Sequence, residues 1–126
     1  MSAEDASKAW ISFESSRTIT EVEKLLGNRP ELTGTTREKL LDTVQDKELA
    51  KIVDGLYRPG ATVGDGGTAS ILVHEFNNGS SKHLIKATGI LKQLRKLSTL
   101  EKLGLNDLDV IDALITDLEN AIDLFN

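Results

Sequence analysis

The stretch "NDLDVIDALITDLENAIDLF", residues 106–125, decides the fold class of this 126-residue chain. Apolar residues recur there every three or four positions, which predicts one long core-facing helix that Asn106 or Asp107 would cap. They are Leu108, Ile111, Leu114, Ile115, Leu118, Ile122 and Phe125. Residues 105–126 hold Asp and Glu but no Lys or Arg, so we expect an acidic C-terminal helix.

The preceding segment, residues 81–103, is basic, with Glu101 as its single acid. Its apolar spacing predicts a helix from Ser81 to Leu97, and Gly104 marks the turn into the last helix. The cations are Lys82, Lys86, Lys92, Arg95, Lys96 and Lys102. Two interpretations are open. The two helices could be neighbours with complementary exposed faces, or the basic face could be available to phosphate.

Residues 1–50 are expected to form N-terminal helices. Apolar spacing predicts helix over residues 5–26, including Trp10 and Phe13, with an interruption at residues 15–18. A second helix could begin at the capping box formed by Thr20 and Glu23.

Breaks in the pattern locate the next turns. Gly27 and Pro30 end the N-terminal segment. Helical spacing resumes from Thr36 to Leu56, as one helix or as two short helices that are jointed near Asp46.

Residues 58–67, "RPGATVGDGG", predict a glycine-rich loop. The apolar run "ASILVHEF" after it predicts a short central helix, with Thr68 as a possible cap and Gly79 as the stop. The glycines have two readings: exposed backbone N–H groups that hold an anion, or positive φ angles in a compact loop.

Together these patterns predict an all-α fold, a compact bundle of about five to seven helices in a single domain, residues 1–126. Five aromatic residues among 39% hydrophobic residues indicate a mostly aliphatic core. No apolar run is long enough to span a membrane, and the N-terminus does not resemble a signal peptide. The net charge of −5 argues against a protein that coats nucleic acid.

The chemistry-bearing residues indicate no metal and no cofactor. Two histidines, no cysteine and no HExxH spacing leave no zinc signature, and the glycine loop lacks the GK[ST] ending of a nucleotide-binding loop. His83 lies between Lys82 and Lys86 at a predicted helix start, where an imidazole beside cations suits acid–base catalysis on a phosphate. The alternative is a surface histidine beside solubilising lysines.

Further candidates flank the glycine loop. His74, next to Glu75, could be a second acid–base group. Arg58 could bind a phosphate while Tyr57 stacks a base. Equally, Tyr57 could be the last core residue of its helix while Arg58 caps the helix carbonyls.

The order of these motifs resembles a known family. "LYRPGATVGDGGTA" (56–69), then "HEF", "NG" and "KHLIKA" (82–87), are similar to a C-terminal domain of bacterial polymorphic toxins of the contact-dependent inhibition and Rhs types. A similar tail occurs on some phage head-morphogenesis proteins. The similarity covers residues 53–97, and the acidic C-terminal helix fits it, whereas residues 1–50 match no family pattern.

The resemblance implies nuclease action inside a target cell. Carried over position by position, it implicates Tyr57, Arg58, Gly60, Gly64, Gly66, Thr68, Glu75, His83 and Lys86. From the residues and the resemblance together, we expect His83, Lys86 and Arg58 to be catalytic and the following residues to bind the substrate: Tyr57, Gly64, Asp65, Gly66, Thr68, His74, Glu75 and Lys82. The chain departs from the family pattern at three positions: Val73 replaces an arginine, Lys82 a glycine and Ile85 a glutamine. Either the activity differs, or the fold is kept for binding alone.

Three functional hypotheses follow. The leading one is a toxin-type effector of interbacterial competition, a metal-independent ribonuclease that acts on RNA such as tRNA in the bacterial cytoplasm and is countered by a cognate immunity protein. The second is a non-catalytic helical interaction module associated with a phage or a secretion system. The third is an acidic immunity or regulatory protein.

Overall fold

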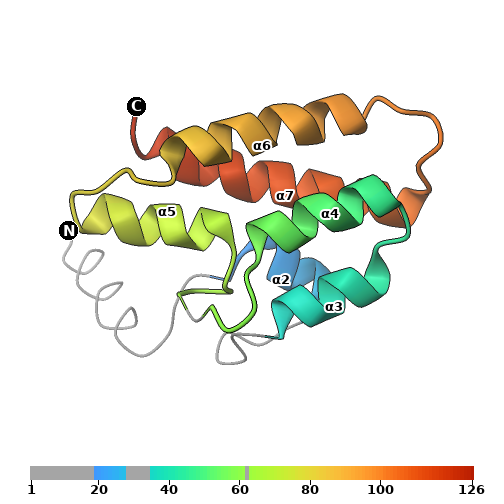
Figure 1. Cartoon of the computed structure of the whole chain (residues 1–126), viewed down its shortest axis with the longest axis horizontal. Coiled ribbons are helices and arrows are strands. Elements are labelled where there is room, and N and C mark those ends of the chain that lie inside the picture. The colour runs from blue at the N-terminus through green and yellow to red at the C-terminus, as the bar shows by residue number, and fades with distance from the viewer. Residues whose placement is uncertain (1–18, 28–34, 62) are drawn as a thin grey trace, which may run out of the picture.

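Six α-helices follow one another in the parts of the chain that the computed structural model describes, residues 19–27, 35–61 and 63–126 (Figure 1). They are α2 (Glu21–Leu26), α3 (Thr36–Thr43), α4 (Lys47–Leu56), α5 (Thr68–Asn77), α6 (Leu84–Leu97) and α7 (Leu105–Asp123). These described residues form no strand; Tyr57 and Gly67 make one isolated antiparallel bridge. The predicted all-α bundle of five to seven helices is confirmed.

The acidic helix α7 is the centre of the bundle. It is the longest helix, with 19 residues, and it contacts α2, α3, α5 and α6. α6 lies along α7 in Figure 1, and α4 packs against both α3 and α6. Because α7 is amphipathic along its whole length, four other helices can bury apolar side chains against it.

The N-terminal capping box is confirmed. The Thr20 hydroxyl accepts a hydrogen bond from the Glu23 amide (3.2 Å), and the Glu23 carboxylate accepts one from the Thr20 amide (3.1 Å). Gly27 ends α2 with a left-handed φ of 73°. The remainder of the helix expected over residues 5–26, with Trp10 and Phe13, lies outside the described residues, as does Pro30.

The predicted joint near Asp46 is confirmed, since α3 and α4 are separate helices. Asp46 caps α4 by accepting hydrogen bonds from the amides of Glu48 (3.1 Å) and Leu49 (3.0 Å). Asp107 accepts from the amides of Gln45 (3.0 Å) and Asp46 (2.8 Å), and it is 4% exposed.

This use of Asp107 corrects the predicted start of the last helix. α7 begins at Leu105 with Gly104 in the capping position, so Asp107 lies in the first turn and neither it nor Asn106 caps the helix. The Asn106 side-chain amide donates to the carbonyl of Thr43 instead (3.0 Å). Both side chains bind backbone groups of residues 43–46, and sequence spacing alone could not reveal these contacts.

The central segment is helical, as expected, but its cap differs. Gly67 is the capping residue of α5, and Thr68 is the first helical residue, whose hydroxyl donates to the Leu56 carbonyl (3.1 Å). Gly79 ends the helix as predicted. Its φ is 73°, and the next amide, that of Ser80, donates to the Glu75 carbonyl (2.8 Å). α6 begins at Leu84, three residues later than predicted, and His83 is its capping residue.

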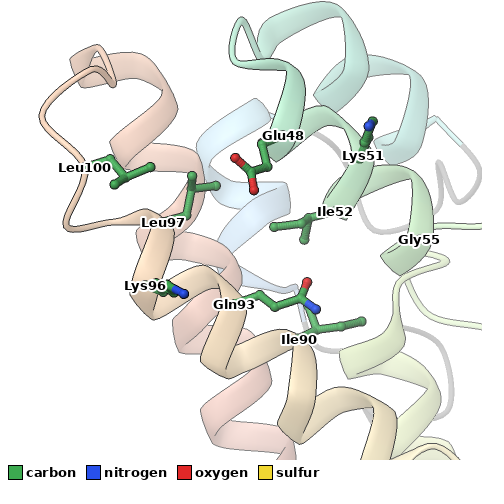
Figure 2. Close-up of a pocket in the computed structure, with 9 residues that line it drawn as sticks. All are labelled: Glu48, Lys51, Ile52, Gly55, Ile90, Gln93, Lys96, Leu97 and Leu100. Atoms are coloured by element: carbon green, nitrogen blue, oxygen red, sulfur yellow. The ribbon is translucent and has the colours of Figure 1, made fainter.

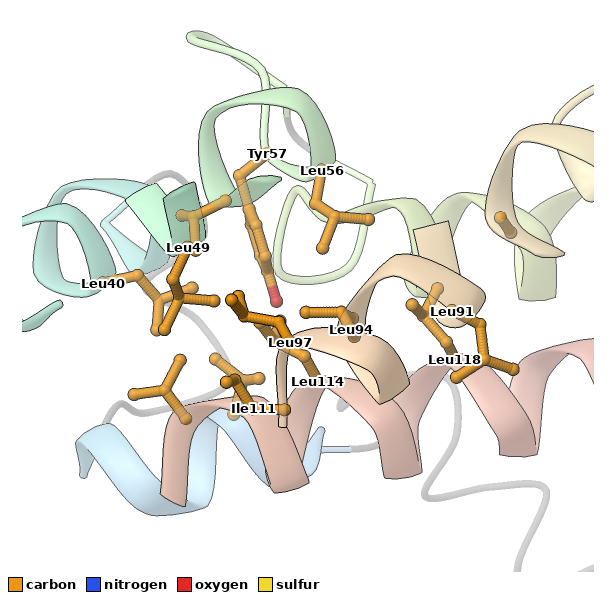
Figure 3. Packing of buried hydrophobic residues seen from close by; sticks show 14 of the residues in the cluster. Leu40, Leu49, Leu56, Tyr57, Leu91, Leu94, Leu97, Ile111, Leu114 and Leu118 are labelled. Atoms are coloured by element: carbon orange, nitrogen blue, oxygen red, sulfur yellow. The ribbon is translucent and has the colours of Figure 1, made fainter. Parts of the chain in front are cut away.

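The buried core that the described residues form is aliphatic apart from one phenol. Leucine, isoleucine, valine and alanine side chains from all six helices are buried together with Tyr57, which Figure 3 shows among them. Leu40, Leu49, Leu94 and Ile111 are fully buried. Full burial of one such side chain contributes about 1.5–3 kcal/mol relative to exposure.

The basic α6 and the acidic α7 are packing neighbours, which supports complementary faces as the reason for their opposite charges. Arg95 of α6 forms an ion pair with Glu119 of α7, both partly exposed. No helix in the described part of the chain is long and apolar enough to cross a membrane.

Candidate functional site

The last turn of α5 and the start of α6 form a histidine–carboxylate pair. Glu75, only 7% exposed, accepts hydrogen bonds from both the amide of His83 (2.9 Å) and its ring nitrogen Nδ1 (2.5 Å). The turn after Gly79 makes this possible, because it reverses the chain and returns residue 83 to the helix that carries residue 75. The backbone contact and the ring contact together fix the imidazole relative to α5.

The carboxylate determines which ring nitrogen can react. Burial alone would raise the pKa of Glu75, but the two hydrogen bonds from His83 and the charges of His83 and Lys82 hold this pKa below its usual value. Glu75 is therefore ionised at neutral pH and can only accept, which places a proton on Nδ1 of His83. The other nitrogen, Nε2, is left to exchange a proton with a ligand. The His83 side chain is 32% exposed.

Two lysines lie beside this pair in the chain. Lys82 is exposed, and its charge acts on Glu75. Lys86 lies one turn along α6 from His83, and its ammonium donates to the carbonyl of Gly55 near the end of α4 (3.1 Å). The start of α6 thus combines an oriented imidazole with two cations, of which one also ties α6 to α4.

The glycine loop is organised around a buried carboxylate. Asp65 is 2% exposed and accepts hydrogen bonds from the Thr20 hydroxyl (2.8 Å), the Gly67 amide (2.9 Å) and the Ser70 hydroxyl (2.9 Å). The Tyr57 hydroxyl donates to the same carboxylate at 3.4 Å. Burial first, and then the charges of Asp65 and Asp117, raise the pKa of Tyr57 well above its usual value.

These contacts correct the expected binding roles in the loop. Tyr57 is 4% exposed and Thr68 is 3% exposed, so neither they nor Asp65 presents a surface to a ligand. The Tyr57 ring has no free face on which a base could stack, and its place is the alternative one, the last core residue of its helix. Arg58 is exposed, and Arg37 donates a hydrogen bond to the carbonyl of Tyr57, the residue that directly follows α4 (2.8 Å).

The loop glycines are explained by backbone geometry. Gly64 has φ of 59° and Gly66 φ of 87°, in the left-handed region that other residues rarely adopt. A Cβ atom on Gly67 would lie 2.7 Å from two carbons of the Tyr57 ring. Backbone conformation and close packing therefore explain these glycines without a bound anion.

The predicted site residues fall into two groups. In the first group His83 pairs with Glu75, Lys82 acts on that carboxylate, and Lys86 lies one helical turn from His83 and donates to the end of α4. The remaining loop residues surround Asp65, and the described hydrogen bonds and ion pairs do not join this group to His83. His74 lies next to Glu75 but is exposed, and its ring contacts Asn78 (3.5 Å).

A groove between α4 and α6 escaped prediction. It has a volume of about 550 Å³, and Figure 2 shows its walls, with Ile52 and Gly55 on α4 and Ile90 and Leu97 on α6. The two helices are about forty residues apart in the sequence, and each alone shows only amphipathic spacing. The sequence therefore held no signal that they enclose a groove.

No three His, Asp or Glu side chains in the described ranges are grouped so that they could hold a metal ion. Comparisons with known proteins found no family model, no curated protein and no solved structure that matches this chain. The function is therefore argued from the site itself, for which the Glu75–His83 pair is the clearest chemical feature.

Proposed function

We propose that the chain is a toxin-type effector domain that cleaves RNA without a metal ion, with His83 as its acid–base group. The observation that carries the proposal is the Glu75–His83 pair, in which a buried carboxylate holds Nδ1 of a partly exposed imidazole. A histidine that only solubilises the surface needs no such partner. The sequence resemblance to polymorphic toxin domains, which covers residues 53–97, supports the same reaction class.

The reaction needs one proton acceptor and charge stabilisation. His83 would take the proton of a ribose 2′-hydroxyl on Nε2 while Glu75 stabilises the imidazolium that forms. The 2′-oxygen forms a bond to phosphorus as the bond from phosphorus to the 5′-oxygen breaks. Water supplies the proton that the 5′-oxygen takes up, and the products are a 2′,3′-cyclic phosphate and a free 5′-hydroxyl.

The nearby cations would balance the charge that develops on phosphorus. Lys82 and Lys86 flank His83 in the chain, and Arg58 follows the helix whose end Lys86 contacts. Cations that the fold already holds beside the reacting phosphate lower the barrier, because they need little reorganisation as the charge develops. In this proposal the glycine loop does not bind the substrate. It supports the end of α4, where the Leu56 carbonyl accepts a hydrogen bond from the Thr68 hydroxyl.

The test is cleavage of tRNA and of total RNA by purified protein in the presence of EDTA. We expect cleavage with cyclic-phosphate ends, and we expect His83→Ala to lower the rate about 10²–10⁴-fold, the usual contribution of a general acid–base group. Glu75→Gln should lower it less, since the amide still accepts from Nδ1 but no longer stabilises a charged ring. Circular dichroism melting curves verify that both variants fold.

Growth supplies the same test inside a cell. Expression of the wild-type chain should arrest bacterial growth, whereas His83→Ala should be tolerated. A wild-type protein that leaves RNA intact from pH 5 to pH 9 and is tolerated on expression would exclude the ribonuclease.

A non-catalytic interaction module is the second candidate, and an apolar surface favours it. Val73 and Phe76 of α5 are 40% and 44% exposed, and Leu124 after α7 is 40% exposed. Phe76 packs edge-on against Phe125, with ring centroids 5.4 Å apart, so the apolar residues of α5 and the C-terminus meet. Light scattering that shows a dimer, lost on Phe76→Asp and unaffected by His83→Ala, would favour this candidate. A cognate immunity protein could dock on the same surface.

A further inference from the structure

We infer that the groove between α4 and α6 binds the single-stranded RNA segment next to the phosphate at His83. This inference rests on the proposed ribonuclease activity and adds the path of the substrate. It concerns a groove whose lining includes no residue of the glycine loop.

The groove leads to the candidate site along one face of α6. Lys86, Ile90 and Leu97 follow one another at spacings of four and seven residues, so they lie on the same side of the helix. Lys86 binds the Gly55 carbonyl, and Gly55 lines the groove. One end of the groove is therefore at Lys86, which is one helical turn, about 5 Å, from His83.

The lining combines apolar residues that suit the bases of a single strand with cations that suit its phosphates. Ile52, Ile90 and Leu97 make an apolar floor against which base faces can pack, while Lys51 and Lys96 supply cations for phosphates. Glu48 is the one acid among the lining residues, and its carboxylate is directed into the groove in Figure 2. A carboxylate there can accept from base amino groups.

Charge favours RNA over other occupants. Two lysines against one acid make the lining positive, in a chain whose net charge is −5. Lys86 adds a further cation at the end nearest His83. A groove with a net positive lining that ends one helical turn from an oriented imidazole is suited to a short anionic strand.

The dimensions fit a few nucleotides. From Lys86 to Lys96 the helix advances ten residues, or about 15 Å. With a spacing of at least 3.4 Å per phosphate along a strand, this length accommodates about two to four nucleotides. The volume of about 550 Å³ is consistent with a short segment and not with a folded RNA.

The test measures binding apart from cleavage. A fluorescein-labelled oligonucleotide of eight 2′-O-methyl nucleotides cannot be cleaved, because its 2′-oxygen carries no proton, and its binding is followed by anisotropy. We expect the double variant Lys51→Glu/Lys96→Glu to bind at least tenfold more weakly than the wild type. The double variant Lys39→Glu/Lys92→Glu makes the same charge change at exposed lysines outside the groove, and it should change binding less than threefold. Equal losses in the two double variants would overturn the inference.

Cleavage kinetics of the same variants separate the two proposals. If the groove holds the strand, Lys51→Glu/Lys96→Glu should raise KM with little change in kcat. His83→Ala should lower kcat about 10²–10⁴-fold while it keeps the oligonucleotide bound. Cleavage with an unchanged KM in the groove variant would show that the groove does not bind the strand, while the ribonuclease proposal would stand. If the wild type binds the oligonucleotide through the groove but cleaves no RNA, the ribonuclease proposal is excluded and the groove is an RNA-binding site only. A wild type that binds no oligonucleotide but forms a dimer through these lysines would show that a second copy occupies the groove.

Discussion

Gly67 is a residue whose replacement has a clear structural consequence. Its φ of −93° and ψ of 166° suit any residue, so backbone strain is not the reason for a glycine at this position. The reason is space: a Cβ atom would meet the Tyr57 ring at 2.7 Å and the Asp65 carboxylate at 3.1 Å. That ring is buried and hydrogen-bonded, so it cannot move aside without disturbing the loop.

We therefore expect Gly67→Ala to lower the free energy of unfolding by about 1–3 kcal/mol, the usual effect of overpacking a closed core site. Gly89→Ala is the matched control, because Gly89 lies inside α6 and a Cβ atom there meets nothing within 4 Å. The control should raise the free energy of unfolding by about 0.5–1 kcal/mol through helix propensity. Urea unfolding followed by circular dichroism measures both. Equal effects of the two substitutions would mean that the Tyr57 ring does not limit this position.

At the scale of elements, α7 fixes the ends of other helices with inward-facing carboxylates. Asp107 binds the amides at the joint between α3 and α4, and Asp117 binds the amides of Glu21 (2.8 Å) and Val22 (3.1 Å) at the start of α2. The acidity of this helix thus has two sources: an exposed face that complements α6, and acids that satisfy the backbone donors of neighbouring helices. Only the first could be expected from composition.

Asp117 makes stability depend on pH. Burial first, and then the charges of Asp65 and Glu21, raise the pKa of Asp117 from 3.8 to about 6 against the opposing effect of the two amides. Between pH 4 and pH 6 the folded chain therefore binds more protons at this site than the unfolded chain does. The contribution of Asp117 to the free energy of unfolding must then fall as the pH rises through this range and stay level above it.

Asp117→Asn removes this titrating group, while the acids other than its neighbours Asp65 and Glu21 titrate alike in both proteins. We expect the Tm of the wild type minus the Tm of Asp117→Asn to increase as the pH is lowered from 7 to 4.5. Thermal unfolding in matched buffers measures the difference. Glu75, whose pKa is lowered, destabilises both proteins equally at the acid end, so it cancels from the comparison. A difference that stays constant with pH would show that Asp117 titrates normally.

At the scale of the whole molecule, the sequence predicts the helices well, because amphipathic spacing and caps are local. The Thr20–Glu23 capping box, the joint at Asp46 and the stop at Gly79 each depend on residues a few positions apart. The predicted caps at Asn106 or Asp107 and at Thr68 failed, since these polar side chains bind groups that are distant in the chain.

The candidate site was predictable only in part. Glu75 and His83 were both named from the sequence, yet their pairing depends on how residues 78–83 turn, which spacing does not specify. The roles expected of Tyr57 and Asp65 could not be separated from core packing, because an aromatic and an acid beside glycines suit either. The groove between α4 and α6 exists only once two distant helices pack together.

The charge distribution of the whole chain leads to a last prediction, on salt. If Lys51 and Lys96 of the groove and Lys86 at its end contact phosphates, three contacts form in a chain whose acids outnumber its bases, and few counterions are released on binding. For a single strand the slope of log affinity against log salt concentration is about −0.7 per phosphate contact, which gives about −2 here. Anisotropy titrations of the 2′-O-methyl oligonucleotide between 50 and 200 mM salt, conditions in which this slope lowers affinity roughly tenfold to twentyfold, measure it. The variant Lys51→Glu/Lys96→Glu should bring the slope close to −0.7, whereas Lys39→Glu/Lys92→Glu should leave it near −2. A slope of about −5 in the wild type would require phosphate contacts spread well beyond the groove, and the strand would then follow another path over the surface.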